Sequence, residues 1–406
     1  MKDTAIRSGH IGICLYEPAK GRYWYQYNAD KYFVPASNTK IFTLYAGLKF
    51  LGDSIPGLKV FESETALTIL PTGDPTLLHP DFKVHNVLNY LKSTEKSIAA
   101  PEYEPNLTRW GNGWAWNDYN ENYMVERSPL PIYGNVVRVS GTKDMISFKP
   151  AGASVIAPKI LKQSGTKKFI SSVQRDFNDN TYTLEFQGVQ PREIEIPFVT
   201  SPELSFRLLS DTLHKNISWN NAPSLETRQI KPFIIYSHPS DSLYKITMHR
   251  SDNFFADQIL LMVSNMHLGY MNDNRIIDTI LNKELADIPQ KPRWVDGSGL
   301  SRYNLFTPQS FVYILNKMKN EFGFERIKNI LPTGGSGTLR NFYLTQKGTL
   351  FAKTGTLSNN VALSGYLFTK NKKLLIFSIL ANNYQTAATP VRKAVEKFLL
   401  GIIKNY

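Results

Sequence analysis

The chain has 406 residues, of which 42% are hydrophobic and 20% are charged, as in a globular protein rather than a disordered one. Its single cysteine, Cys14, excludes an intrachain disulfide and a zinc site built from several cysteines. The net charge of +13 permits a polyanionic partner. The basic residues are dispersed along the chain, however, which favours an ordinary solvated surface.

The sequence predicts neither a membrane-spanning segment nor an export signal. Its longest apolar run, residues 374–381, is much shorter than the roughly 20 residues that cross a bilayer as a helix. The first ten residues, MKDTAIRSGH, lack the apolar core of a signal peptide. We therefore expect a chain that is cytoplasmic or whose targeting segment has been removed.

The N-terminal part predicts a β-hairpin followed by a helix. Residues 10–16 and 22–27 are apolar-rich runs on either side of a turn that contains Pro18 and Gly21. Apolar residues then recur at helical spacing over residues 38–51, and Gly52 is a plausible helix stop.

The C-terminal part predicts three more strands and a closing helix. The strand-like runs are residues 350–353, 362–368 and 374–381. The helix covers residues 389–404 and has Pro390 near its first turn. Strands at both chain ends, with helices between them, indicate one α/β domain to which both termini contribute.

The middle of the chain differs in character. Short strand-like runs at residues 67–70, 181–186 and 193–198 alternate with clusters of Pro, Gly and Asn. One helix is predicted over residues 202–215, and no internal repeat is found. We interpret residues 63–230 as an inserted β-rich region of two small lobes. Residues 1–62 and 231–406 then form the main domain.

The segment Pro35–Lys40 contains the pattern S-x-x-K at the start of the predicted N-terminal helix. This spacing places Ser37 and Lys40 one turn apart on the same helix face. Serine needs a base to become a nucleophile, and a lysine whose pKa is lowered by burial can be that base. The pattern occurs five times in the chain, so position at a helix start distinguishes this copy.

Two further short patterns could serve the same chemistry. Ser251-Asp-Asn253 offers a hydroxyl that can relay a proton and an amide that can orient a lysine or a substrate carbonyl. The simpler interpretation, which is compatible with this role, is a helix N-cap at Ser251 or Asp252. Lys353-Thr-Gly occurs once, at the end of a predicted strand, where an extended peptide could pair with the strand edge. The competing interpretation is a strand-to-turn transition with a solvated lysine.

S-x-x-K, S-D-N and K-T-G in this order are the motif set of penicillin-binding proteins and class A β-lactamases. The chain resembles the D-alanyl-D-alanine carboxypeptidase/endopeptidase branch of the low-molecular-mass penicillin-binding proteins, in which a large insertion separates the first two motifs. Here 214 residues separate Ser37 from Ser251, and only 102 separate Ser251 from Lys353. The resemblance implies a β-lactamase/transpeptidase-like domain, an antiparallel sheet flanked by helices.

Other segments are similar to the same family, so the resemblance extends from residue 35 to residue 366. They are Gly73–Leu77, Gly111–Asp118, Asp296–Ser301, Leu331–Gly335, Gly337–Leu339 and Ala362–Tyr366. The resemblance is weakest between about residues 135 and 230, and the insertion is shorter than in larger members.

The resemblance implies a catalytic role for four residues. Ser37 would attack the carbonyl between the last two D-alanines of a peptidoglycan stem peptide, and Lys40 would be the general base. Ser251 would pass the proton to the leaving amine, and Asn253 would hold Lys40 and the substrate amide. Water would then hydrolyse the acyl-enzyme.

It also implies a set of substrate-binding residues. Lys353 and Thr354 would bind the terminal carboxylate, and Gly355 would permit close approach. The backbone N–H groups of Ser37 and Thr356 would form the oxyanion hole. Neither a metal nor an organic cofactor is implied.

Asp118 is a further candidate. In the family, an acidic residue in the aromatic G-W-x-W segment can meet the free amino end of the stem peptide, and Asn117 is the competing position. The alternative is that Trp114 and Trp116 only pack and that Asp118 is a turn residue.

Three other functions compete with this interpretation. A β-lactamase is the closest, but the Glu-x-x-Leu-Asn loop of class A enzymes is not matched, since Glu284-Leu285 is followed by Ala286. A catalytically silent peptidoglycan-binding protein would be expected to have degenerate motifs. A nucleic-acid-binding module would be expected to have basic residues interleaved with aromatics. We therefore predict a serine DD-peptidase with peptidoglycan stem peptides as substrates, β-lactams as covalent inhibitors and a periplasmic or otherwise extracytoplasmic location.

Overall fold

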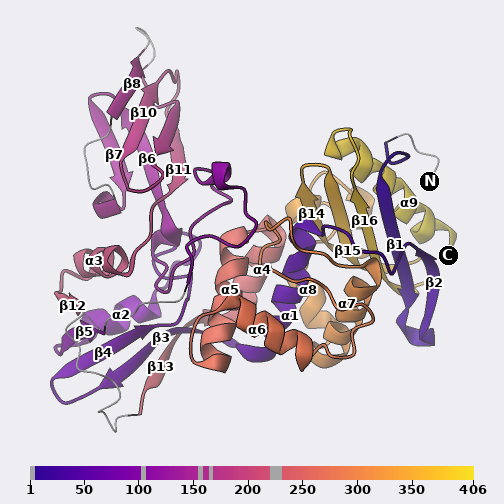
Figure 1. Cartoon of the computed structure of the whole chain (residues 1–406), viewed down its shortest axis with the longest axis horizontal. Coiled ribbons are helices and arrows are strands. Elements are labelled where there is room, and N and C mark those ends of the chain that lie inside the picture. The colour runs from indigo at the N-terminus through magenta and orange to yellow at the C-terminus, as the bar shows by residue number, and fades with distance from the viewer. Residues whose placement is uncertain (1–4, 102–106, 154–158, 164–167, 220–230) are drawn as a thin grey trace.

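The fold was analysed in a computed structural model, which describes residues 5–101, 107–153, 159–163, 168–219 and 231–406. It has two parts that lie side by side (Figure 1). One part contains both chain ends, and the other is formed by the middle of the chain. In the described residues, no helix is both long and apolar enough to cross a membrane.

The part that holds both termini is built on a five-stranded antiparallel sheet in the order β14-β15-β16-β1-β2. Its strands are β1 (His10–Glu17), β2 (Arg22–Tyr27), β14 (Leu350–Leu357), β15 (Asn360–Phe368) and β16 (Leu374–Asn382). Cys14 of β1 lies opposite Ser378 of β16, so the two ends of the chain share one sheet. Cys14 is buried, as its apolar strand neighbours suggest.

Both faces of this sheet are covered, and therefore β15 and β16 are apolar along almost their whole length. Helix α9 (Ala388–Asn405) covers one face with Val391, Val395, Leu399 and Ile403, which recur at helical spacing. The other face carries a helical layer. Its members are α1 (Lys40–Phe50), α4 (Ser240–Arg250), α5 (Asn253–Leu268), α6 (Asp273–Asn282), α7 (Pro308–Phe322) and α8 (Phe324–Ile330).

Helices α1 and α5 lie at the centre of this layer and are buried nearly all round. Their neighbouring N-terminal ends carry two of the three predicted motifs. The antiparallel sheet flanked by helices and shared by both chain ends confirms the predicted α/β class.

The middle of the chain begins with a second five-stranded sheet in the order β12-β5-β4-β3-β13. Its elements are β3 (Ser54–Glu62), β4 (Ala66–Pro71), β5 (Ser97–Ala100), β12 (Ile217–Trp219) and β13 (Phe233–Pro239), with helices α2 (Asn86–Ser93) and α3 (Pro202–Leu213). This sheet crosses the predicted boundaries, because β3 and β13 pair with each other and β3 pairs with β4. Residue 230, the predicted end of the insertion, lies outside the described residues. The division into a main domain and an inserted region stays a proposal. The strand pairing favours an inserted region that begins near residue 53 and ends near residue 239.

Two three-stranded sheets form the outer end of the inserted part (Figure 1). One has the order β11-β6-β7 and the other β8-β10-β9. Their strands are β6 (Val136–Thr142), β7 (Met145–Lys149), β8 (Lys159–Gln163), β9 (Ser172–Arg175), β10 (Tyr182–Phe186) and β11 (Glu193–Pro197). Residues 107–135 connect this outer lobe to the second sheet and contain the short helix η3 (Trp116–Asp118).

Candidate active site

Ser37 lies in a single turn of 3-10 helix, η2 (Ala36–Thr39), that leads directly into α1. Lys40 is the first residue of α1, and its Nζ lies 3.1 Å from Ser37 Oγ. The predicted spacing of one helical turn therefore brings the nucleophile and the base within hydrogen-bond distance.

Lys40 is completely buried and has two further partners. Its Nζ donates to Asn253 Oδ1 and to the backbone carbonyl of Ser298, both at 2.6 Å. Burial lowers the pKa of Lys40 to about 8, although the charges of Asp257, Asp296 and Asp252 oppose this shift. The lowered pKa is what the predicted role of Lys40 as the base for Ser37 would require.

Ser251 and Asn253 lie where α4 ends and α5 begins. The N-cap of α5 is Asp252, whose side chain accepts from the backbone N–H of Phe255. Ser251 ends α4 in the left-handed region, with φ 60°, so the capping role falls to Asp252 and leaves Ser251 and Asn253 to face the site. Asn253 also donates through Nδ2 to the carbonyl of Tyr123 at 2.9 Å.

Lys353 differs from the solvated lysine at a strand end that was the competing interpretation. Strand β14 continues to Leu357, and Lys353 is completely buried within it. Its Nζ donates to Ser251 Oγ at 2.8 Å and to the carbonyl of Thr354 at 2.6 Å. Burial, helped by the charge of Lys40, lowers the pKa of Lys353 well below its usual value. Ser251 therefore links the second and third motifs.

Gly355 is a point at which β14 passes close to Ser37. A Cβ atom at this position would lie 2.6 Å from the carbonyl oxygen of Pro35 and 3.1 Å from the backbone nitrogen of Ser37. Any side chain would push the strand away from η2, so the close approach requires glycine. Thr356 follows it, and Arg392 donates to its hydroxyl.

Ser37, Ser251, Asn253 and Thr356 open onto one cavity of about 390 Å³. The other described residues in its lining are Trp114, Ala115, Asp118, Tyr123, Met124, Gly299, Leu300, Arg302, Leu357 and Ser358. This volume suits a short peptide segment.

Asp118 lies on this cavity wall, whereas Asn117 is exposed. Tyr123 lines the same wall, and burial, together with the nearby charge of Asp118, raises the pKa of Tyr123 to about 12. Trp116 is 71% exposed and is therefore not the packing residue of the alternative interpretation. Trp114 does pack, and its Nε1 donates to Asp296 Oδ2 at 2.9 Å.

The sequence alone did not predict a role for Asp296, which begins the Asp296–Ser301 segment, or for Arg302, which follows it. Asp296 is completely buried and accepts from the backbone N–H groups of Gly299 and Ser301 at 2.8 and 2.7 Å. It thereby shapes the loop whose Ser298 carbonyl holds Lys40. Arg302 lines the same cavity as Asp118. The sequence did offer one signal for Arg302, because it directly follows the Asp296–Ser301 segment that resembles the family.

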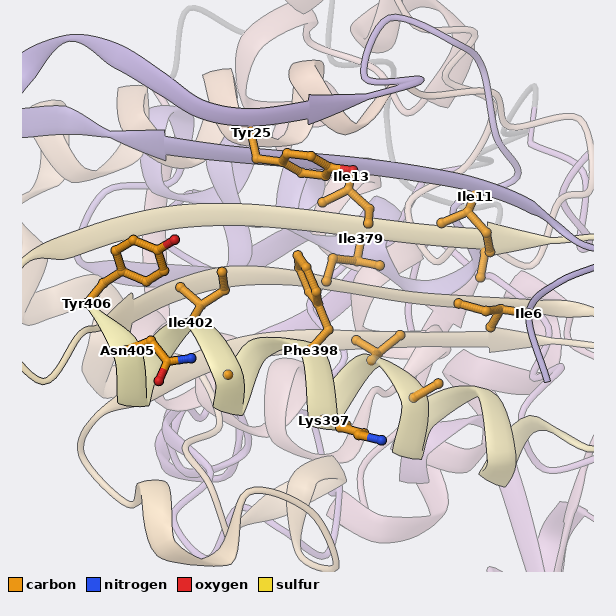
Figure 2. Close-up of a pocket in the computed structure, with 14 residues that line it drawn as sticks. Ile6, Ile11, Ile13, Tyr25, Ile379, Lys397, Phe398, Ile402, Asn405 and Tyr406 are labelled. Carbon is orange, nitrogen blue, oxygen red and sulfur yellow. The ribbon is translucent and has the colours of Figure 1, made fainter. Parts of the chain in front are cut away.

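A larger cavity of about 730 Å³ lies elsewhere, between α9 and the sheet (Figure 2). Ile11, Ile13 and Ile379 of the sheet face Phe398 and Ile402 of α9 across it. Its lining contains none of the predicted site residues. The smaller cavity, which Ser37, Ser251 and Asn253 line, is therefore the candidate active site.

Proteins of known identity resemble this chain over most of its length. It is 21% identical to penicillin-sensitive carboxypeptidase A of Dictyostelium discoideum, over 96% of this chain and 86% of that one. It is 23% identical to a D-alanyl-D-alanine carboxypeptidase of an Actinomadura species, over 96% of this chain and 80% of that one. The crystal structure of penicillin binding protein 4 from Haemophilus influenzae shares the fold. The TM-score is 0.78 at 18% identity, with 98% of this chain and 97% of that chain covered.

The model of the peptidase S13 family, described as the D-Ala-D-Ala carboxypeptidase 3 (S13) family, matches residues 1–401. The match includes all three motifs and the inserted region between the first two. The chain therefore belongs to the D-Ala-D-Ala carboxypeptidase 3 (S13) family.

Proposed function

We propose that this protein is a serine DD-peptidase that cleaves peptides ending in D-Ala-D-Ala, and the equivalent cross-links of peptidoglycan, through an acyl-enzyme on Ser37. The observation that carries this proposal is the chain of contacts Ser37–Lys40–Asn253 and Ser251–Lys353 around one cavity. Three motifs far apart in the sequence supply these contacts, and each partner has the chemistry that acyl transfer requires.

In acylation, neutral Lys40 takes the proton of Ser37 while Oγ bonds to the substrate carbonyl carbon. The tetrahedral intermediate then breaks its C–N bond, and the leaving amine receives a proton through Ser251. The backbone N–H groups of Ser37 and Thr356 are proposed to stabilise the oxyanion. Water repeats the sequence on the ester and releases the shortened peptide.

Substrate binding is proposed to use the KTG segment. The terminal carboxylate would meet Lys353 and Thr354, and its negative charge would raise the pKa of the buried lysine and favour its charged form. An extended peptide would lie along β14, where Gly355 permits close approach.

The stem-peptide side chain is proposed to lie against the wall that contains Asp118. Asp118 would pair with a free amino end, and Arg302 on the same cavity would favour a carboxylate beside it. A cell-wall substrate implies an extracytoplasmic location, with the periplasm as the expected compartment.

The same site predicts slow turnover of β-lactams, in contrast to a β-lactamase. Rapid deacylation requires a base that activates water at the acyl-enzyme. Among the described residues that line the cavity, Asp118 alone carries a carboxylate, and its proposed role is to bind the free amino end of the peptide. We therefore expect penicillin to remain attached to Ser37.

The test is the intact mass of the protein after mixing with benzylpenicillin, with Ser37→Ala as the control. A persistent adduct of one penicillin mass, absent from Ser37→Ala, together with release of D-alanine from a D-Ala-D-Ala peptide, is the expected result. Rapid consumption of penicillin without an adduct would favour a β-lactamase. Neither adduct nor consumption would favour a silent peptidoglycan-binding protein.

A further inference from the structure

Residues 110–126 form the wall of the active-site cavity that carries Asp118. They supply Trp114, Ala115, Asp118, Tyr123 and Met124 to its lining. The only regular structure of this described segment is the three-residue helix η3. Its internal backbone hydrogen bonds close only single turns, so the position of the segment as a whole depends on its neighbours.

The main domain fixes the wall at two points. Trp114 donates to Asp296 at 2.9 Å, and the carbonyl of Tyr123 accepts from Asn253 at 2.9 Å. Between these points lie residues 115–122, which include Asp118.

The outer lobe of the inserted region holds the part in between. The backbone N–H of Arg175, the last residue of β9, donates to Asn120 Oδ1 at 3.0 Å, and Asn120 Nδ2 returns a bond to the Arg175 carbonyl at 3.3 Å. The same carbonyl accepts from the Tyr119 hydroxyl at 3.1 Å. One backbone unit of the lobe therefore fixes the two residues that directly follow Asp118.

Side chains of the lobe add a second set of contacts to both ends of the wall. The guanidinium of Arg175 is completely buried and pairs with Glu126 at 3.2 Å. The ring of Phe177 lies 5.0 Å from that of Trp110 and 5.1 Å from that of Tyr119. Aromatic pairs at such separations restrict both partners.

We infer that the outer lobe positions the substrate-selecting wall, with Arg175 and Phe177 as positioning residues that do not touch the substrate. This inference rests on the proposed contact between Asp118 and the stem peptide. It assigns to the inserted region a role in selectivity, while the acylation chemistry stays in the main domain. Displacing Asp118 by about 1 Å should weaken a charge-assisted contact much more than it affects Ser37.

The variant for the test is Phe177→Ala, because Phe177 is half-buried and its removal leaves no unpaired charge. Truncation of Arg175 would remove the closest cation from the buried Glu126, which keeps Arg109 at 3.8 Å and the Thr200 donors, and the loss of stability would obscure any effect on the wall. Phe148→Ala in β7 is the matched control, since Phe148 is also half-buried but packs against Tyr182 within the lobe. Phe177→Tyr keeps the ring and should restore the wild-type behaviour.

Three substrates are compared for each variant. They are a D-Ala-D-Ala peptide whose side chain has a free amino end, the same peptide acetylated at that end, and benzylpenicillin, which lacks the side chain. For Phe177→Ala we expect KM for the free-amine peptide to rise roughly tenfold with kcat nearly unchanged, and the acylation rate with benzylpenicillin to stay within about twofold. Phe148→Ala should change none of these values.

Asp118→Asn separates this inference from the proposed contact. If Asp118→Asn weakens binding of the free-amine peptide and Phe177→Ala does not, the inference that the lobe positions the wall is overturned. The proposed contact between Asp118 and the amino end then stands. If only Phe177→Ala has the effect, the lobe positions the wall but the amine meets another group. The inference would also be overturned if Phe177→Ala slowed acylation by benzylpenicillin as much as it impaired the free-amine peptide. The substitution would then have displaced the catalytic residues themselves.

Discussion

Lys40 is a base only in its neutral form, and its pKa of about 8 places that form within reach of neutral pH. Below pH 8 the neutral fraction falls tenfold for each unit of pH. We therefore expect the second-order rate constant for acylation by benzylpenicillin to rise with pH by nearly tenfold per unit and to level off above about pH 8. The rate of adduct formation by intact mass, from pH 5.5 to 9.5, measures this.

A pH-independent rate would contradict Lys40 as the titrating base. Lys40→Ala should abolish acylation and leave the far-ultraviolet circular dichroism spectrum of the folded protein unchanged. Normal acylation by this variant would transfer the role of base to another group.

Asp296 carries the loop that holds Lys40. Besides the two backbone N–H groups, its carboxylate accepts from Asn304 Nδ2 at 2.7 Å and from Trp114. Asp296→Ala would leave several buried donors unsatisfied, and we expect the free energy of unfolding to fall by about 3 kcal/mol or more. Urea titration measures it. Asp278→Ala, at an exposed position of α6, should change it by less than about 0.5 kcal/mol.

The contacts among the proposed catalytic residues could be anticipated at this scale because each motif is short and local spacing sets its geometry. Ser37 and Lys40 are one turn apart in any helix. The contacts of Asp296 and Arg302 could not be predicted in this way, because they join segments that only the folded chain brings together. The burial of Lys353 was missed for the same reason, since it depends on what covers β14.

At the scale of elements, the approach of β14 to η2 determines where the KTG segment lies relative to Ser37. Gly355→Ala would place a Cβ atom 2.6 Å from Pro35 O, and 3.0 and 3.1 Å from the backbone nitrogens of Asn38 and Ser37. We expect acylation by benzylpenicillin to slow by roughly 10- to 100-fold, because a small displacement of reacting groups has a large effect. Stopped-flow or mass kinetics measures the rate.

Gly401→Ala is the matched control for this change. Gly401 lies in α9, where an added Cβ atom would meet no other atom within 4 Å. The variant should acylate normally and gain about 0.5–1 kcal/mol of stability. Wild-type acylation in Gly355→Ala would mean that the strand can shift without disturbing the site.

The strands and helices at the two chain ends could be predicted from periodicity, including the hairpin of β1 and β2 and helix α9. How the strands pair was harder to predict from the sequence. Strands β3 and β13 lie far apart in the sequence, and the predicted boundaries assign both to the main domain, yet they pair with each other in the second sheet. Register between distant strands depends on tertiary packing, which local pattern does not contain.

At the scale of the whole molecule, the hydrophobic interior is divided. Two clusters lie on the two faces of the catalytic sheet. A third lies in the inserted part, and its buried members all fall between residues 58 and 217. Phe82, Val125 and Val136 are the described residues of the insertion that join the catalytic core. Separate cores predict separate cooperative units.

We therefore expect two transitions in calorimetric unfolding. Benzylpenicillin should raise the midpoint temperature of only one of them, because the acyl group makes its contacts only in the folded catalytic part. Two matched core variants assign the transitions. Leu380→Ala, in the catalytic core, should destabilise the part of the chain whose transition responds to penicillin. Leu184→Ala, in the core of the insertion, should destabilise the other part, and each loss should be about 2–5 kcal/mol. If both variants and penicillin move a single transition, the contacts of Arg175 and Phe177 with the wall couple the two cores into one unit.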